Sequence, residues 1–262
     1  MTQPESKRSP SADDRAAYGT ETIKILSGGA ANGLVRRLEA RFYRETGLST
    51  DGDYGAVGGM VERIRGGEAV DLMILTKANI DDLTASGHVL AESARHIGRV
   101  ATGISVNQGQ PIPSIADSAS LHRTLSAASA LYVPDTRQST AGRHILSVLG
   151  ALGLAQTMQG RLREFKNGLT AMQQMALDDV PGALGCTQIT EIVATPGVVY
   201  AGDLPGEHGL STTYTAAVSS AATRPAEATI FISILTDPAE ADTRRDSGFS
   251  TIGQHIEESA KI

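Results

Sequence analysis

Residues 22–47 read TIKILSGGAANGLVRRLEARFYRETG, and this stretch decides the fold. Its first part, Thr22–Ser27, is rich in β-forming side chains, and Gly28 and Gly29 follow. Apolar residues then recur every four positions, the spacing of one helix face: Leu34, Leu38 and Phe42. Gly47 is a natural stop for that helix. The stretch therefore predicts a strand, a glycine turn and a helix.

The same order repeats along the chain. A run near 48–53 leads to a helix ending at Arg65, and the apolar run Val70–Leu75 is typical of a buried parallel strand. Further elements are expected as helices at 121–128, 140–152, 168–177, 225–235 and 238–246, and as strands at 130–133, 182–186 and 198–201. Alternating strands and helices predict parallel sheets covered by helices.

Two long β-rich runs, Arg95–Val106 and Leu210–Ser220, interrupt this alternation. Strands of that length can leave one lobe and enter another, with crossings near residues 99–106 and 207–214. We therefore predict an α/β fold of two lobes joined by a two-stranded hinge, with the ligand cleft between them. The expected division is a disordered leader at 1–20, lobe 1 at 21–101 and 211–249, lobe 2 at 102–210, and a C-terminal tail at 250–262.

The composition narrows the class of partner. The 262 residues are 40% hydrophobic and 20% charged, as in globular proteins. The formal net charge of -6 argues against nucleic acid as the main partner. One cysteine rules out a disulfide or a cysteine-based zinc site within one chain, and the six histidines lack metal-ligand spacing. We expect no metal and no other cofactor.

The N-terminal residues bear on localisation. Residues 1–20 are polar and contain no apolar segment of a signal peptide, and no run of the chain is long enough to span a membrane. We expect a cytoplasmic protein without a membrane span. A misassigned start codon would instead leave room for a periplasmic protein that meets an ABC permease.

Small and polar residues gather where four predicted strands end. Ligands of open α/β sheets bind beyond the carboxyl ends of the strands. Glycine lets a ligand approach the backbone, and helix N-termini offer N–H donors to an anion. The four ends are Ser27-Gly28-Gly29, Gly58-Gly59, Ser139-Thr140-Ala141-Gly142 and Thr187-Gln188. They match neither a Walker A loop nor the G-x-G-x-x-G fingerprint. We predict a cleft that closes on a small anion.

Four segments resemble the molybdate-binding proteins of ABC transporters, which have the type II periplasmic-binding fold. They are IKILSGGAANGLVRRLEARFYRETG from Ile23, GAVGGMVERIRGGEAVDLMIL from Gly55, YVPDTRQSTAG from Tyr132 and ALGCTQITEI from Ala183. The likeness covers roughly residues 22–248.

Three positions depart from that family. Molybdate binders carry serines where this chain has Ala30 and Gly58-Gly59, and the tyrosine that contacts their oxyanion falls at Cys186. The glycine-rich variant resembles a neighbouring branch that includes the bacterial aconitate isomerase. This resemblance implies a small unsaturated di- or tricarboxylate as ligand.

Two functions follow as hypotheses. The first is an isomerase of such an acid, acting by allylic proton transfer or cis–trans isomerisation. Proton-carrying candidates near strand ends are Lys77, Cys186, His144 and Glu191, each of which also has an ordinary structural explanation. Ligand-binding candidates are Ser27, Gly28, Gly29, Gly58, Gly59, Thr76, Arg137, Ser139, Thr140, Lys166 and Gln188. The second hypothesis is a non-catalytic solute-binding protein of an ABC importer, or a cytoplasmic anion sensor.

Overall fold

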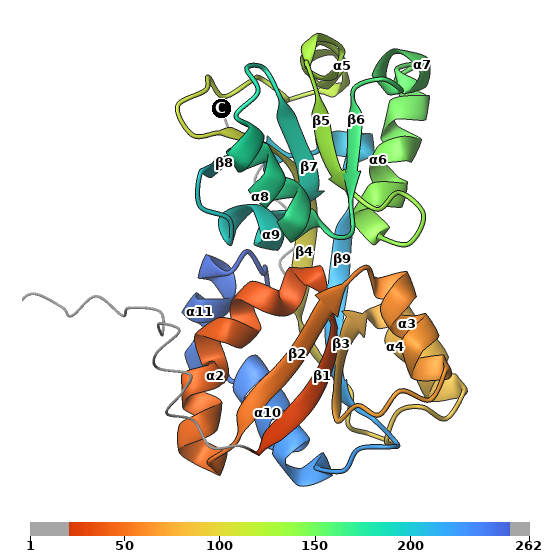
Figure 1. Cartoon of the computed structure of the whole chain (residues 1–262), viewed down its shortest axis with the longest axis vertical. Helices are drawn as coiled ribbons and strands as arrows, with labels where there is room; N and C mark the ends of the chain where they lie inside the picture. Colours follow the sequence, from red (N-terminus) through yellow and green to blue (C-terminus); the bar gives the residue numbers. More distant parts are fainter. Residues whose placement is uncertain (1–20, 252–262) are drawn as a thin grey trace, which may run out of the picture.

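One strand, β4 (Arg95–Asn107), runs through both halves of the molecule (Figure 1). The structure is a computed structural model that describes residues 21–251. Residues 95–101 of β4 pair antiparallel with β9, and residues 102–107 pair with β7 and β8. The returning chain lies beside this crossing, because the Thr102 N–H donates to the Leu210 carbonyl. We call the half that contains the N-terminal part of β4 lobe 1 and the other half lobe 2.

Lobe 1 has the strand order β2-β1-β3-β9-β4. β1, β2 and β3 are parallel, and β9 lies antiparallel between β3 and β4. Its strands are β1 (Thr22–Gly28), β2 (Ser49–Gly55), β3 (Leu72–Thr76) and β9 (Ser211–Val218). Its helices are η1 (Gly29–Ala31), α2 (Asn32–Thr46), α3 (Val57–Arg65), α4 (Lys77–Ala85), α10 (Pro225–Thr236), η3 (Pro238–Glu240) and α11 (Ala241–Asp246).

Lobe 2 continues the sheet as β4-β7-β5-β6, with β8 pairing β4. β5, β6 and β7 are parallel to one another. The strands are β5 (Leu131–Pro134), β6 (Leu162–Phe165), β7 (Leu184–Gln188) and β8 (Val198–Asp203). The helices are α5 (Ser118–Ala127), α6 (Thr140–Ala151), α7 (Ala155–Met158), α8 (Gly168–Asp178), α9 (Ile189–Val193) and η2 (Gly206–His208).

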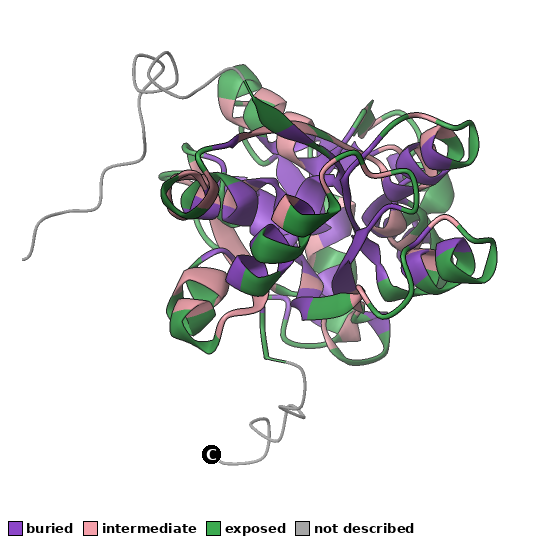
Figure 2. Ribbon diagram, turned by 90° about the horizontal axis from the view of Figure 1, so that it is seen from below, coloured by how far each residue is buried: buried purple, intermediate pink, exposed green. Residues whose placement is uncertain are grey.

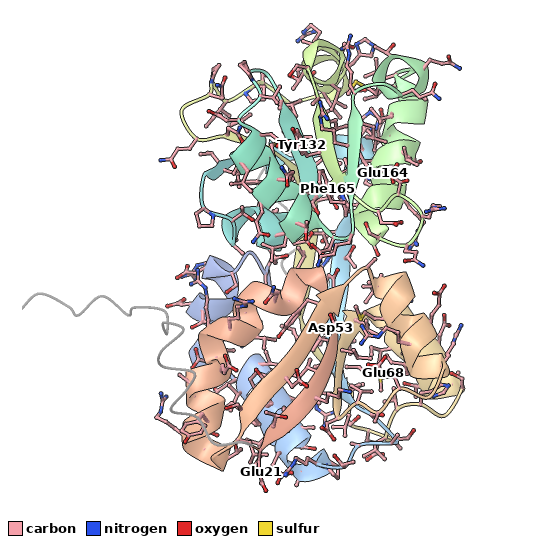
Figure 3. All side chains as sticks on the ribbon, in the orientation of Figure 1. Glu21, Asp53, Glu68, Tyr132, Glu164 and Phe165 are labelled. Atoms are coloured by element: carbon pink, nitrogen blue, oxygen red, sulfur yellow. The ribbon has the colours of Figure 1, made fainter. Side chains whose placement is uncertain are left out.

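Each lobe has an apolar core of its own, and the buried residues lie inside the layers of helices (Figure 2). In lobe 1, the rings of Phe42 on α2 and Phe231 on α10 lie 4.8 Å apart. In lobe 2, Tyr132 of β5 stacks on Phe165 of β6 at 5.9 Å, and Figure 3 labels both. Separate cores let each lobe hold its shape while the chain crosses between them.

The α/β fold with two lobes is confirmed, whereas some elements differ from the prediction. α7, β6 and α9 were not predicted, and the predicted helix at 238–246 is a 3-10 turn followed by α11. β7 ends at Gln188 rather than at Cys186. The lobe boundaries stay a prediction that agrees with the partner change in β4. The leader, 1–20, and the tail beyond Thr251 lie outside the described residues.

The helices between residues 21 and 251 include none with the length and hydropathy that a bilayer crossing needs.

Asp71, at the start of β3, ties together three segments of lobe 1. Its carboxylate accepts hydrogen bonds from the backbone N–H groups of Lys24, Thr223 and Arg224 at 2.7–3.0 Å. Burial alone would raise the pKa of Asp71, but these donated bonds outweigh it and hold the pKa below its usual range. The ionised carboxylate therefore joins the start of β3 to β1 and to the segment just before α10.

We expect Asp71→Asn to lower the free energy of unfolding at neutral pH by about 2 kcal/mol, because the amide nitrogen would face backbone donors. A lowered pKa stabilises the fold above the unfolded-state value, and that contribution is lost as the pH falls through the folded-state pKa. The gap between variant and wild type should therefore shrink below roughly pH 4. Urea titrations across acidic pH measure the difference in unfolding free energy. A difference that is constant with pH would contradict the lowered pKa of Asp71.

Candidate functional site

A cavity lies where the strand ends of the two lobes face each other. Its empty space is about 290 Å³ with the open solvent at its mouth included, and about 20 Å³ of it can hold the centre of a water molecule. Lobe 1 lines it with Gly29, Ala30 and the segment 55–57, and lobe 2 lines it with the segments 139–141 and 167–168. No lysine or arginine is among the described residues that line it. Any anion held there would be bound by neutral groups.

The start of α6 offers backbone donors to the cavity. Ser139 caps this helix, since its hydroxyl accepts from the Gly142 N–H at 2.8 Å. The N–H groups of Thr140 and Ala141, which line the cavity, have no acceptor within residues 21–251. Free N–H groups and the positive end of the helix dipole favour an anion at this place.

Direct contacts already join the lobes beside the cavity. The Gly58 N–H donates to the Gln138 carbonyl at 3.2 Å, and the Asn167 amide donates to the Tyr54 carbonyl at 3.2 Å. The backbone amide of Gly58 is therefore occupied by lobe 2. The structure shows the two lobes closed against each other.

Glu191 places a carboxyl group in the wall of this cavity. The residue is 6% exposed and lies on α9, directly after β7. One carboxylate oxygen accepts from the Gly168 N–H at 3.1 Å, and the other accepts from the Thr187 hydroxyl at 2.5 Å. Burial raises the pKa of Glu191, and these hydrogen bonds offset only part of that effect. A carboxyl with a raised pKa can hold a proton closer to neutral pH.

Gln188 and Tyr214 meet at the hinge side of the cavity, which both residues line. The Tyr214 hydroxyl donates to Gln188 Oε1 at 2.7 Å. Gln188 Nε2 is buried and has no partner in the described part of the chain. Burial raises the pKa of Tyr214, so its hydroxyl stays protonated and remains a donor.

Five of the predicted site residues line the cavity: Gly29, Ser139, Thr140, Gln188 and Glu191. Others lie just behind it. Ser27 is fully buried and donates to the Gly28 carbonyl, and Thr76 caps α4 through the Asn79 N–H. A side chain at Gly28 would meet Val57 and Tyr214, and one at Gly58 or Gly59 would meet Gln138. Their small size allows close packing around the site.

Five other predicted residues lie away from the cavity lining. Arg137 and Lys166 are exposed, and Lys77 pairs with Asp81 on the surface of α4 at 2.6 Å. Long cationic side chains remain in water unless an ion pair draws them inward. Their assigned roles in binding or proton transfer gain no support from these positions.

Cys186 and His144 are also outside the lining. Cys186 packs in the apolar core of lobe 2, and burial raises the pKa of its thiol to about 12. His144 contacts the His208 carbonyl through Nε2 at 2.8 Å. Gln188, two residues beyond Cys186, is the residue of β7 that reaches the cavity, because it stands at the carboxyl end of the strand.

The lining residues that were not predicted include Asn167, Gly168 and Tyr214. Asn167 caps α8 by accepting from the Thr170 N–H at 2.8 Å. An asparagine followed by glycine before a helix is a recognisable capping signal. Tyr214 lies inside a β-rich run and carries no comparable signal.

The chain belongs to the bacterial extracellular solute-binding protein family, whose model matches residues 23–250. A curated relative, the aconitate isomerase of a Pseudomonas species, is 24% identical over an alignment of 251 positions that covers 90% of this chain and 90% of the relative.

Solved structures of similar fold include two anion-binding proteins. The periplasmic molybdate-binding protein of Azotobacter vinelandii is 18% identical over 88% of this chain and 99% of its own, with a TM-score of 0.71. The sulfate-binding protein of Mycobacterium tuberculosis is 16% identical over 89% of this chain and 88% of its own, with a TM-score of 0.68. These likenesses show the type II periplasmic-binding fold, as the sequence predicted.

The contact between Gly168 and Glu191 tests how tightly the cavity wall is packed. A Cβ atom at Gly168 would overlap the Glu191 carboxylate and the Thr187 hydroxyl. We expect Gly168→Ala to cost about 1–3 kcal/mol of unfolding free energy, as overpacked sites do. Chemical denaturation measures the loss. Gly160→Ala is the control, because a Cβ there meets nothing within 4 Å. If Gly168→Ala and Gly160→Ala were equally stable, the cavity wall at Gly168 would not be tightly packed.

Proposed function

We propose that the protein binds a small unsaturated di- or tricarboxylate in the cleft between its lobes and isomerises it, with Glu191 as the proton carrier. One observation carries the proposal: a buried carboxyl with a raised pKa lies in the wall of a cleft that also presents free backbone N–H groups. The N–H groups would hold a substrate carboxylate, and the carboxyl group would move the proton.

The reaction needs a single base. Glu191 would take a proton from the methylene carbon beside the double bond, while the negative charge spreads over the neighbouring carboxylate. The double bond would shift to that carbon, and the protonated Glu191, whose acidic proton exchanges with solvent, would protonate the former vinylic carbon. Atoms and charge balance without a cofactor. Donors at the start of α6 would stabilise the charge that develops on the substrate carboxylate.

The curated relative adds support, because a protein named aconitate isomerase is 24% identical over nine-tenths of both chains. The cavity is consistent with a ligand of that chemistry. Neutral donors at Thr140 and Ala141 would bind a carboxylate without an ion pair. The raised pKa of Glu191 makes its carboxylate a stronger base toward the substrate methylene proton.

A second candidate is binding without chemistry, as a solute receptor for an ABC importer or as an anion sensor. Hydrogen bonds to both oxygens of Glu191 favour it, because they are typical of a carboxylate that fixes a helix terminus. The family itself is one of solute-binding proteins, and two relatives of similar fold are named for molybdate and sulfate. Proteins that share a fold often differ in function, because function depends on the residues of the site.

Turnover decides between the two. The protein is incubated with trans-aconitate in deuterated water, and the product is followed by NMR. Isomerisation with deuterium in the product supports the proposal. Tight binding without turnover supports the receptor, for which thermal shifts with trans-aconitate, molybdate and sulfate rank the ligands.

Replacing Thr140 tests the backbone donors. Thr140 is the first residue of α6, where proline is tolerated, and Ser139 before it is extended, as a residue before proline must be. Thr140→Pro removes one N–H and should weaken anion binding roughly tenfold. Thr140→Ala keeps the N–H and is the control. Calorimetric titration measures both affinities, and equal affinities would argue against an anion at this helix start.

Replacing Glu191 tests the proton carrier. Glu191→Gln should lower turnover at least about 100-fold, because the amide cannot accept a proton. A raised pKa stabilises the fold below the unfolded-state value, and this contribution is lost as the pH rises through the folded-state pKa. The variant should therefore gain stability over wild type as the pH rises. Turnover assays and thermal denaturation from roughly pH 5 to 9 test both. Full activity in the variant would exclude Glu191 as the carrier.

A further inference from the structure

We propose that Gln188 is the specificity-determining residue of the cleft, donating a hydrogen bond from Nε2 to an acceptor oxygen of the ligand, and that Tyr214 is the positioning residue that sets its orientation. The inference rests on the proposed function only in taking the ligand to be a small anion.

Gln188 is the last residue of β7 and is 3% exposed, yet its Nε2 has no partner among residues 21–251. A buried donor without an acceptor is costly and uncommon in folded proteins. The residue lines the cavity, so a ligand that enters can supply the missing acceptor. The free donor is thus an observation independent of the helix start at Thr140.

Tyr214 settles which end of the carboxamide is left for the ligand. Its hydroxyl donates to Gln188 Oε1 at 2.7 Å, which leaves the two N–H groups of the buried Nε2 without a partner. The bond also joins β9 of lobe 1 to β7 of lobe 2. The donor is therefore held in place when the lobes are closed.

The Tyr214 ring is itself fixed by its neighbours. Phe249 packs against it edge to face, with ring centroids 6.3 Å apart. On another side, a Cβ atom at Gly28 would lie 3.1 Å from the ring, closer than ordinary packing allows. The glycine at the end of β1 thus leaves room for the tyrosine that orients Gln188. This gives Gly28 a role in positioning Tyr214.

A donor of this kind selects by geometry and not by charge. Gln188 is neutral, and no described lysine or arginine lines the cavity, so an anion gains there by hydrogen bonding and the dipole of α6 and not by an ion pair. Sites built around such a donor reject a ligand that lacks the matching acceptor far more strongly than apolar sites reject an extra methylene. We infer that the ligand places an oxygen that only accepts, such as one of a carboxylate, against Nε2.

The test measures calorimetric affinities of the full chain for trans-aconitate, molybdate and sulfate. Gln188→Glu exchanges the donor for a charged acceptor and should weaken binding about 100-fold or more, whereas Gln188→Ala should weaken it about tenfold. Gln156→Glu is the matched control, because it adds the same charge on the exposed face of α7. Affinity in Gln188→Glu equal to that of the control would overturn the proposal.

Tyr214→Phe separates a positioning role from a structural one. If Tyr214 acts through Gln188, the change should weaken binding several-fold in wild type and have no further effect in Gln188→Ala. A purely structural effect would be the same in both backgrounds and would overturn the role of Tyr214. Denaturation of each variant shows that the protein being titrated is folded.

The outcomes also separate this inference from the proposed function. Binding of one of the three anions without turnover of trans-aconitate would end the isomerase proposal. The role of Gln188 would then still be tested by the affinities of its variants. Wild type that binds none of the three anions would overturn the inference as well. Turnover with unchanged affinity in Gln188→Glu would overturn the inference alone.

Discussion

The backbone of β4 has to satisfy hydrogen bonds to strands of both lobes within one continuous sheet. Its first part pairs with β9 and its second part with β7 and β8, so one strand positions both lobes. Because the strand is continuous, the lobes meet where its partners change, near Thr102. Gln188 pairs with Thr102 and Tyr214 pairs with Gly98 across β4. The two residues that meet in the cleft are thus fixed by their registers on the same strand.

Periodicity predicted the elements that bury one face and failed where burial is slight. The helix at Leu34, Leu38 and Phe42 shows its period because all three side chains are buried. β6 contributes four residues, of which Arg163 and Glu164 are exposed, so no alternation marks it as a strand. Tyr132 and Phe165 stack between β5 and β6, a contact that two distant sequence positions do not reveal.

The candidate site was predictable as far as it depends on helix starts. Ser139 and Thr140 carry a capping signal and line the cavity. Placing β7 two residues too early singled out Cys186, which faces the core on the same side of the strand as Gln188. Arg137 and Lys166 have the right charge for an anion, but a sequence does not say that they face water. Tyr214 reaches the site only because β9 pairs between β3 and β4, and the sequence does not reveal that pairing.

The donors at the start of α6 are peptide groups, and this limits how such a cleft can change. Exchanging a side chain cannot delete a peptide N–H, except by proline, so the capacity to hold an anion belongs to the backbone. On the proposal made above, selectivity would reside in the few side chains that supplement it, such as Gln188. Proteins with this architecture can therefore change ligand specificity by single side-chain substitutions, while the backbone donors that hold an anion stay in place.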